Sequence, residues 1–304
     1  MHKPSILAMA LALAATAAQA ESLLGLTTTN QLVRFDSANP TQGTQAVAVS
    51  GLALNERLLG LDARPSTGVL YSISDAGRLY TLDATTGVAS FVANLTAGSP
   101  AAGGGAFTGL SGTSFGIDFN PVPDLGMSLP SLRVVSNAGQ NLRINVNGAS
   151  AGLTFMDVAL NGATSAIVAS AYTNNDTDPA TGTVLYGIDT RAGALFTTSA
   201  PNAGTMTKVG DLGVSAIGVT GFDISVSGMA YAALTDGDTG LSQLYGINLT
   251  TGAATSLGAF GVGGNALQAP LVGLTAAPVP EPSTVALMLA GLGAMTLVAR
   301  RRRV

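Results

Sequence analysis

The sequence lacks the side chains on which many enzymes and most transition-metal sites depend. It contains no cysteine and no tryptophan, and its single histidine is His2, at the N-terminus. The absence of cysteine excludes disulfides and thiol nucleophiles. Without histidine, the body of the chain has no zinc or haem site of the usual kind and no histidine-based mechanism. A domain of this size can be stabilised by apolar burial, so the lack of disulfides is compatible with export.

Charged side chains are also scarce, at 10% of the chain. Between residues 21 and 277 the acidic side chains outnumber the basic ones by about two to one. Such a body does not attract nucleic acid or anionic lipid through its net field. The composition therefore predicts no nucleic-acid partner.

A short alternating segment recurs along the body. It occurs at Gly77 to Gly87 (GRLYTLDATTG), at Thr183 to Gly193 (TVLYGIDTRAG) and at Ser242 to Gly252 (SQLYGINLTTG). Each copy reads as a β-strand that runs into a turn, with a spacing of about 50 residues, which is typical of propeller or solenoid arrays.

A second motif, Gly-apolar-Asp, precedes these segments at Gly60 to Asp62, Gly116 to Asp118 and Gly221 to Asp223, and Phe155 to Asp157 is a weaker version. Each version is interpreted as the first of four short antiparallel strands, which together make one propeller blade. On this interpretation Ala166 to Tyr172 is the second strand of the blade that begins near Phe155.

The two ends of the body complement each other. Leu271 to Thr275 reads as a first strand without partners, and the start of the chain supplies three strands without a first one, at 23–27, 30–36 and 45–50. Together they predict a fifth blade that closes the ring and leaves no free edge. We therefore expect an all-β, five-bladed propeller. A β-sandwich and a β-solenoid are the alternatives, but neither predicts complementary half-blades.

Both ends of the chain read as targeting segments. Residues 1–20 combine Lys3, the apolar run Ile6 to Ala18 and a small-residue cleavage site that ends at Ala20, which predicts a secretory signal peptide. The predicted domains are the signal peptide at 1–20, the propeller at 21–277 and a sorting tail at 278–304.

The tail begins with Val279, Pro280, Glu281, Pro282 and Ser283, continues with the apolar run Thr284 to Ala299, and ends with Arg300, Arg301, Arg302 and Arg303. This arrangement resembles the PEP-CTERM sorting signal of Gram-negative bacteria. The resemblance implies transient anchoring in the inner membrane, with an exosortase-type enzyme as processing partner. The positive-inside rule independently places the arginines on the cytoplasmic side. A plain C-terminal anchor is the alternative, although 16 apolar residues are few for a permanent span.

The body resembles a bacterial family known as domain of unknown function 4394. The residues that carry the resemblance include Gly25 to Thr27, Leu32 to Asp36, Leu59 to Pro65 and Gly77 to Tyr80. This family brings no established activity, so the resemblance implies no catalytic residues.

The Gly-apolar-Asp motif places acids on strands that line the channel of a propeller. We therefore expect Asp62, Asp118, Asp157 and Asp223 to meet at the axis, with Thr275 in the same position of the fifth blade. Two interpretations stay open. Converging carboxylates are oxygen ligands suited to calcium or magnesium. Alternatively, each aspartate accepts backbone amide hydrogens of its own or the next blade and fixes the blade spacing.

Other motifs are weaker. Asn174, Asp176 and Asp178 have the spacing of the first half of a calcium loop but lack its glycine and terminal glutamate, so solvated turns are the better interpretation. Gly112 to Gly116 fits the Gly-x-Ser-x-Gly pattern of hydrolases, but no histidine base accompanies it and a strand follows it.

The sequence leaves two hypotheses about function open. The first is an exported binding or structural protein of the cell surface or extracellular matrix, with an exopolysaccharide or another surface protein as partner and no catalytic residues. The second is a lyase or hydrolase that acts on extracellular polysaccharide through aspartate and tyrosine chemistry. An enzyme should show a deep pocket at the channel mouth with a desolvated carboxylate in it.

Overall fold

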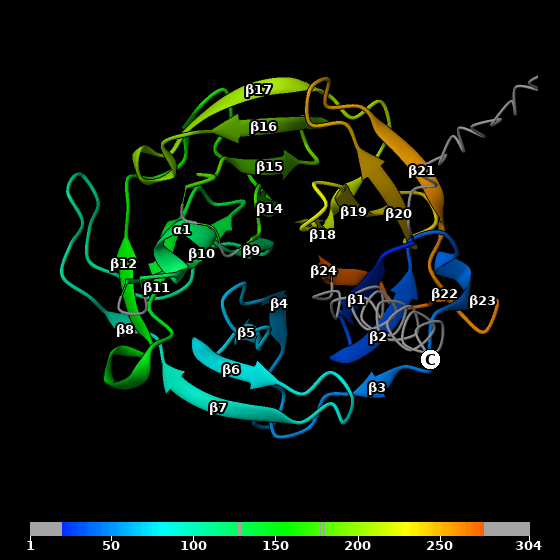
Figure 1. Cartoon of the computed structure of the whole chain (residues 1–304), viewed down its shortest axis with the longest axis horizontal. Helices are drawn as coiled ribbons and strands as arrows, with labels where there is room; N and C mark the ends of the chain where they lie inside the picture. Colours follow the sequence, from blue (N-terminus) through cyan, green and yellow to red (C-terminus); the bar gives the residue numbers. More distant parts are fainter. Residues whose placement is uncertain (1–19, 127–128, 177, 179, 277–304) are drawn as a thin grey trace, which may run out of the picture.

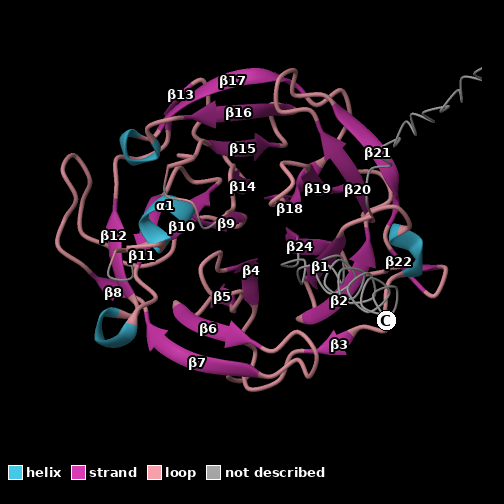
Figure 2. Ribbon diagram, viewed as in Figure 1, coloured by secondary structure: helices cyan, strands magenta, loops and turns pink. Residues whose placement is uncertain are grey.

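The computed structural model describes residues 20–126, 129–176, 178 and 180–276. Five small antiparallel sheets stand around a common axis as the blades of a propeller, as Figures 1 and 2 show. The predicted five-bladed, all-β fold is confirmed. The sorting residues of the tail and the signal peptide lie outside the described residues.

In each blade the strands follow one another from the axis outward. Blade 1 consists of β4 (Leu58–Ala63), β5 (Leu70–Ser74), β6 (Arg78–Leu82) and β7 (Ala89–Asn94). Blade 2 consists of β9 (Phe115–Phe119), β10 (Leu132–Ser136), β11 (Asn141–Ile144) and β12 (Leu153–Met156), with β8 (Thr96–Ala97) parallel to β12 on the outer edge.

Blade 3 consists of β14 (Ala169–Tyr172), β15 (Leu185–Asp189), β16 (Ala194–Thr198) and β17 (Thr205–Asp211), with β13 (Asn161–Gly162) outside them. Blade 4 consists of β18 (Ile217–Ile224), β19 (Ala230–Thr235), β20 (Ser242–Ile247) and β21 (Ala254–Ala259). A small hairpin of β22 (Gly261–Val262) and β23 (Asn265–Ala266) follows blade 4.

Blade 5 closes the ring as the sequence predicts. Its innermost strand is β24 (Leu271–Ala276), which pairs with β1 (Ser22–Thr27), and β2 (Gln31–Asp36) and β3 (Val47–Ala48) complete the sheet. Closure by strands from both ends of the body pairs β24 with β1 and makes the ring continuous.

The predicted strand order is wrong in the third blade. Residues 153–156 form β12, the fourth strand of blade 2, and the first strand of blade 3 is β14. The segment around Phe155 was misread because it alternates apolar and small residues and ends in Asp157, as the true first strands do. By contrast, β14 contains neither the glycine nor the aspartate of the motif.

Among the described residues, helical structure is confined to the connections. It comprises α1 (Pro121–Asp124) and short 3-10 turns at Pro40–Gln42, Gly148–Ser150 and Pro201–Ala203. Asn120 caps α1 by accepting a hydrogen bond from the Val122 amide at 3.1 Å. No helix in the described part of the chain has both the length and the apolar character needed to cross a bilayer.

Apolar burial lies between the blades. The alternation along each strand directs every second side chain toward one neighbouring blade. Five apolar clusters result, one at each blade interface. The cluster between blades 2 and 3 is the smallest and consists of Val135, Leu160, Ile167, Ala194, Phe196 and Met206.

Candidate functional site

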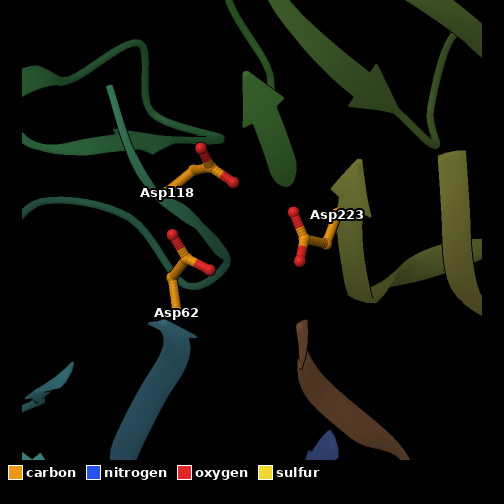
Figure 3. A group of neighbouring side chains, drawn as sticks. All are labelled: Asp62, Asp118 and Asp223. Carbon is orange, nitrogen blue, oxygen red and sulfur yellow. The ribbon is translucent and has the colours of Figure 1, made fainter. Parts of the chain in front are cut away.

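Three aspartates meet at the axis of the ring. Asp62, Asp118 and Asp223 lie at corresponding places on β4, β9 and β18, and one carboxylate oxygen from each lies within 4.8 Å of the others. All three side chains are buried, and Figure 3 shows them pointing toward one another. The sequence predicted this convergence from the Gly-apolar-Asp motif.

Each axial carboxylate also accepts an amide hydrogen from the inner strand of the next blade. Oδ2 of Asp62 lies 2.8 Å from the Phe119 amide, Oδ1 of Asp118 lies 3.1 Å from the Tyr172 amide, and Oδ2 of Asp223 lies 2.6 Å from the Ala276 amide. Hydrogen bonds from amides to carboxylates are among the stronger ones in proteins. The three bonds join blade 1 to blade 2, blade 2 to blade 3 and blade 4 to blade 5.

Thr275 lies between two of the acids, as expected for the fifth blade. Its hydroxyl oxygen is 2.9 Å from Oδ1 of Asp62 and 3.0 Å from Oδ2 of Asp223. A hydroxyl has one proton to donate. Full hydrogen bonds in both directions therefore require that one carboxyl group carries a proton of its own.

The electrostatics of the cluster lead to the same conclusion. Burial raises the pKa of Asp62 well above its ordinary value, and the nearby Asp223 charge adds to this effect. Burial, followed by the charges of Asp62 and Asp223, likewise raises the pKa of Asp118. Burial raises the pKa of Asp223 to about 6, although the Ala276 amide favours its charged form. Near neutral pH the three groups therefore do not carry three full charges.

The predicted axial position of Asp157 is wrong. This residue follows β12, and its Oδ2 accepts hydrogen bonds from Nη1 of Arg133 and Nε of Arg143, each at 2.7 Å. Its Oδ1 accepts a further bond from Nη2 of Arg143 at 2.7 Å. Asp157 is therefore the buried counterion of two arginines within blade 2.

In blade 3, Ala171 takes the position that an aspartate holds in blades 1, 2 and 4 and that Thr275 holds in blade 5. The Tyr172 amide bonds to Asp118, just as the residues that follow Asp118 and Thr275 bond to Asp62 and Asp223. The third blade therefore supplies no carboxylate, and the axial set is three aspartates and Thr275. All four offer oxygen, which suits a hard cation, but most of these oxygens already accept amide hydrogens.

Arg133 forms a polar contact between blades 2 and 3 that the sequence did not reveal. Its side chain is buried, and Nε donates to the Tyr172 hydroxyl at 3.1 Å while Nη2 donates to Oδ1 of Asn202 at 2.6 Å. A further bond joins Nη1 to Oδ1 of Asn141 at 2.8 Å. The bonds to Tyr172 and Asn202 cross the interface with the smallest apolar cluster, whereas the bond to Asn141 stays within blade 2.

Glycines let the inner strands of neighbouring blades approach one another closely, between the three acids and the side of the ring on which the inner strands begin. A Cβ atom at Gly116 would lie 2.5 Å from the Ser170 amide nitrogen, one at Gly221 2.6 Å from that of Leu274, and one at Gly273 2.9 Å from that of Leu61. Real Cβ atoms do not approach backbone this closely, so only glycine allows the inner strands to come together here. This ring of glycines separates the acids from the opposite mouth of the channel.

A cavity of about 500 Å³ occupies that mouth. It lies at the beginnings of the inner strands, whereas the acids lie at their ends. Its lining comes from all five blades: Thr28, Arg57, Leu58, Leu59, Asp75, Leu110, Gly112, Thr113, Ser114, Phe115, Val168, Gly218, Thr220 and Val272. The sequence could not reveal this cavity, because its lining combines short segments far apart in the chain.

Polar and apolar side chains both line the mouth cavity. Nε of Arg57 lies 3.7 Å from Oδ2 of Asp75, and both side chains are exposed to solvent. On the far side, Oδ1 of Asn137 accepts hydrogen bonds from the Thr113 and Ser114 amides at 2.9 and 3.3 Å, which holds that loop in place. The cavity therefore combines apolar side chains with several polar ones, as small-molecule sites do.

The other sequence motifs form turns. Oδ1 of Asp176 accepts a hydrogen bond from the Asp178 amide, and Oδ1 of Asp178 accepts one from the Ala180 amide. Oδ1 of Asp236 similarly accepts from the Asp238 amide. These are bonds of Asp to its own turn. Ser114, in the Gly-x-Ser-x-Gly segment, lies in the loop before β9 rather than at a strand-to-helix turn.

Comparisons with known proteins confirm both resemblances. A family model described as "Domain of unknown function (DUF4394)" matches residues 31–271, and one described as "PEP-CTERM protein-sorting motif" matches residues 278–303. No curated protein matches the chain.

Two solved structures are similar to the chain at low identity. The extracellular domain of the putative hybrid two component system BT3049 from B. thetaiotaomicron is 12% identical, with a TM-score of 0.38, over 79% of this chain and 30% of that one. BamB from Moraxella catarrhalis is 16% identical, with a TM-score of 0.29, over 81% of this chain and 62% of that one. The chain thus spans less than two thirds of the length of either protein.

Proposed function

Because the chain belongs to the DUF4394 family, which has no assigned function, we propose from its geometry that it is an exported binding protein whose ligand enters the mouth cavity. The observation that carries this proposal is the cavity of about 500 Å³ to which all five blades contribute. A site assembled from five blades is held rigidly by the ring, which favours binding without reorganisation.

The position of the acids favours binding over catalysis. The enzyme hypothesis requires a desolvated carboxylate at the channel mouth. The carboxyl groups with raised pKa values, those of Asp62, Asp118 and Asp223, lie at the other end of the inner strands, beyond the glycines. The lining of the mouth cavity includes one acid, Asp75, which is exposed and lies beside Arg57, and it includes no tyrosine.

The sorting motif supports export of the protein. Its presence indicates an exported protein that is processed by an exosortase-type enzyme. We propose that the chain is held transiently in the inner membrane by the apolar run after Ser283 and then reaches the cell surface or extracellular matrix. The polar side chains of the mouth cavity suit an exopolysaccharide, because its hydroxyl groups can form hydrogen bonds with Arg57, Thr113 and Ser114. Another surface protein is the second kind of partner that we propose.

A glycan-array and pull-down screen with the purified chain, freed of its signal peptide, tests this proposal. We expect a ligand that binds without being cleaved. Arg57→Ala should weaken binding at least tenfold, about 1.4 kcal/mol. Lys208→Ala, which changes an exposed cation on the outer strand β17 and away from the cavity lining, should leave binding unchanged.

The same screen can also detect the result that would contradict the proposal. Depolymerisation of a bound polysaccharide, abolished by a single Asp→Asn change, would replace the binding function with the enzyme alternative.

Sorting has its own test in cells. A chain that lacks Pro280 to Pro282 should have its signal peptide removed normally and stay in the inner membrane. Delivery of that deletion variant to the surface or medium in ordinary amounts contradicts the proposed role of the tail.

A further inference from the structure

Both ends of the ring leave from one face of the propeller. The inner strands β4, β9, β18 and β24 end together, since Thr275 and the three axial acids lie in contact near their C-terminal ends. Ala276, the last residue of β24, pairs with Leu23 at the beginning of β1. We call the side of the ring on which these strands end the tail face. The mouth cavity opens on the opposite side.

The segment that joins the ring to the apolar run is short. Thr284 lies eight residues beyond Ala276. At about 3.5 Å per residue, even a fully extended chain covers only about 28 Å. Ala276 also lies close to the axis, because its amide is bonded to Asp223 and β24 is the innermost strand of its blade.

This length restricts how the ring can sit on a membrane. To present the opposite side, the segment would first pass outward over β1, β2 and β3, a distance of about 14 Å at the usual strand spacing. It would then follow the six-residue depth of β24, which is about 20 Å. The sum exceeds the length of the extended segment, so the side with the mouth cavity cannot turn to the membrane, whereas the tail face can.

The tail face carries several exposed apolar side chains, all in the connections that follow inner strands. They are Val69 (39% exposed), Val122 (40%), Leu129 (52%), Val226 (65%) and Met229 (47%). The hairpin that contains Val226 and Met229 lies beside the N-terminal end of the ring, where the Ser227 hydroxyl bonds to the Glu21 carboxylate. These side chains belong to blades 1, 2 and 4 and lie on the face from which the tail leaves.

We propose that the tail face rests on the lipid bilayer while the tail holds the chain, with these apolar side chains in contact with the lipid. This inference rests on the anchoring role that Proposed function gives to the tail. Exposed Asp36 and Asp83 lie on the same side as the partly exposed Arg34, so this face has no excess of positive charge to attract anionic headgroups. The contact is therefore apolar, and the mouth cavity faces away from the membrane.

The absence of cysteine makes the orientation directly measurable. Single labels are introduced by Val226→Cys on the tail face and by Leu54→Cys, 92% exposed, in the loop that precedes β4 on the opposite side. The full chain without its signal peptide is reconstituted into vesicles of phosphatidylethanolamine and phosphatidylglycerol that contain a lipid-borne quencher. We expect loss of fluorescence from position 226 and none from position 54, with no change when salt is raised.

Each other outcome counts against the inference. Equal loss at both positions, or loss at position 54 alone, overturns the orientation. Loss at position 226 that disappears with salt overturns the apolar contact. A chain that floats with the vesicles without quenching at either position overturns lipid contact and leaves the tail face to a protein partner. A chain that does not float overturns the anchoring itself, which separates failure of the proposed function from failure of the orientation. Equal melting temperatures of both variants and the parent confirm that the ring is intact.

Discussion

Asp118 combines two effects at a single residue. Its carboxylate accepts the Tyr172 amide hydrogen and so joins blades 2 and 3. The same carboxylate is buried beside two other acids, which raises its pKa. The hydrogen bond stabilises the ring, and the charge destabilises it at high pH. Substitutions that keep one of these effects and remove the other can separate them.

Asp118→Asn keeps an oxygen for the Tyr172 amide and removes the charge, whereas Asp118→Ala removes both. At pH 8 the alanine variant should be less stable than the asparagine variant by about 1–3 kcal/mol, the cost of a buried amide hydrogen without a partner. Urea unfolding of both variants measures the difference. Equal stabilities would show that the bond between blades contributes little.

The raised pKa of Asp223 leads to a prediction of how the stability of the ring depends on pH. Its pKa is raised to about 6 in the folded protein, chiefly by burial. A group that binds its proton more tightly when folded stabilises the protein fully below its unfolded pKa, and that contribution is lost as pH rises through the folded pKa. Stability should therefore fall by about 2 kcal/mol between pH 4 and pH 7 from this residue, and further from Asp62 and Asp118.

Thermal melting across this pH range measures the decline. Asp223→Asn should flatten it, because the variant has no proton to lose at that position. Carboxylates with lowered pKa values, such as Asp83 and Asp236, act in the opposite direction only at lower pH. A melting temperature that rises from pH 5 to pH 7 contradicts the raised pKa values at the axis.

At the scale of the strands, the spacing of the blades depends on two kinds of interface. Glycines bring inner strands of neighbouring blades into backbone contact near the axis. Farther out, the interface between blades 2 and 3 has the smallest apolar cluster and is crossed by the hydrogen bonds of Arg133. Contacts between inner strands thus set the spacing of the blades near the axis, and a buried polar network joins blades 2 and 3 farther out.

Gly116→Ala tests the strand contact. The added Cβ would lie 2.5 Å from the Ser170 nitrogen, so β9 and β14 must separate, at a cost of about 1–3 kcal/mol. Gly246→Ala, on β20, is the matched control, because the nearest atom to its Cβ would be 3.8 Å away. Melting temperatures compare the two variants. An equal effect of both would mean that the glycines do not set the approach of the inner strands.

Asp157→Asn tests the polar network. The change removes the counterion of the buried Arg133 and of Arg143, which should cost about 3–5 kcal/mol. Asp211→Asn, which breaks the exposed pair with Lys208, should cost less than about 1 kcal/mol. Denaturant unfolding measures both. Similar losses in the two variants would contradict the structural role assigned to Asp157.

At the scale of the whole molecule, the sequence specified the ring better than the site. The strand pattern and the partnerless Leu271 to Thr275 predicted the closure, because pairing depends on alternation that is visible in the chain. Three axial acids followed from the same motif. Asp157 was misplaced because the end of β12 imitates an inner strand, while Ala171 lacks the motif that would have identified it. The mouth cavity depends on packing among five blades and has no local signature.

The mouth cavity and the axial aspartates lie on opposite sides of the ring. In this account the mouth cavity takes the ligand, and the carboxylates at the other end hold the blades together instead of binding a cation. The alternative assignment, a calcium or magnesium site formed by Asp62, Asp118, Asp223 and Thr275, makes a different prediction for stability. A cation that binds only the folded ring raises its melting temperature by mass action.

Thermal melting of the purified chain with millimolar calcium, and separately with EDTA, tests this assignment most directly. If the axial aspartates hold the blades together through amide hydrogen bonds, the melting temperature is the same in calcium, in EDTA and in buffer alone. A rise with calcium that EDTA reverses and that Asp118→Asn abolishes would show that the axis binds a cation and would contradict the account.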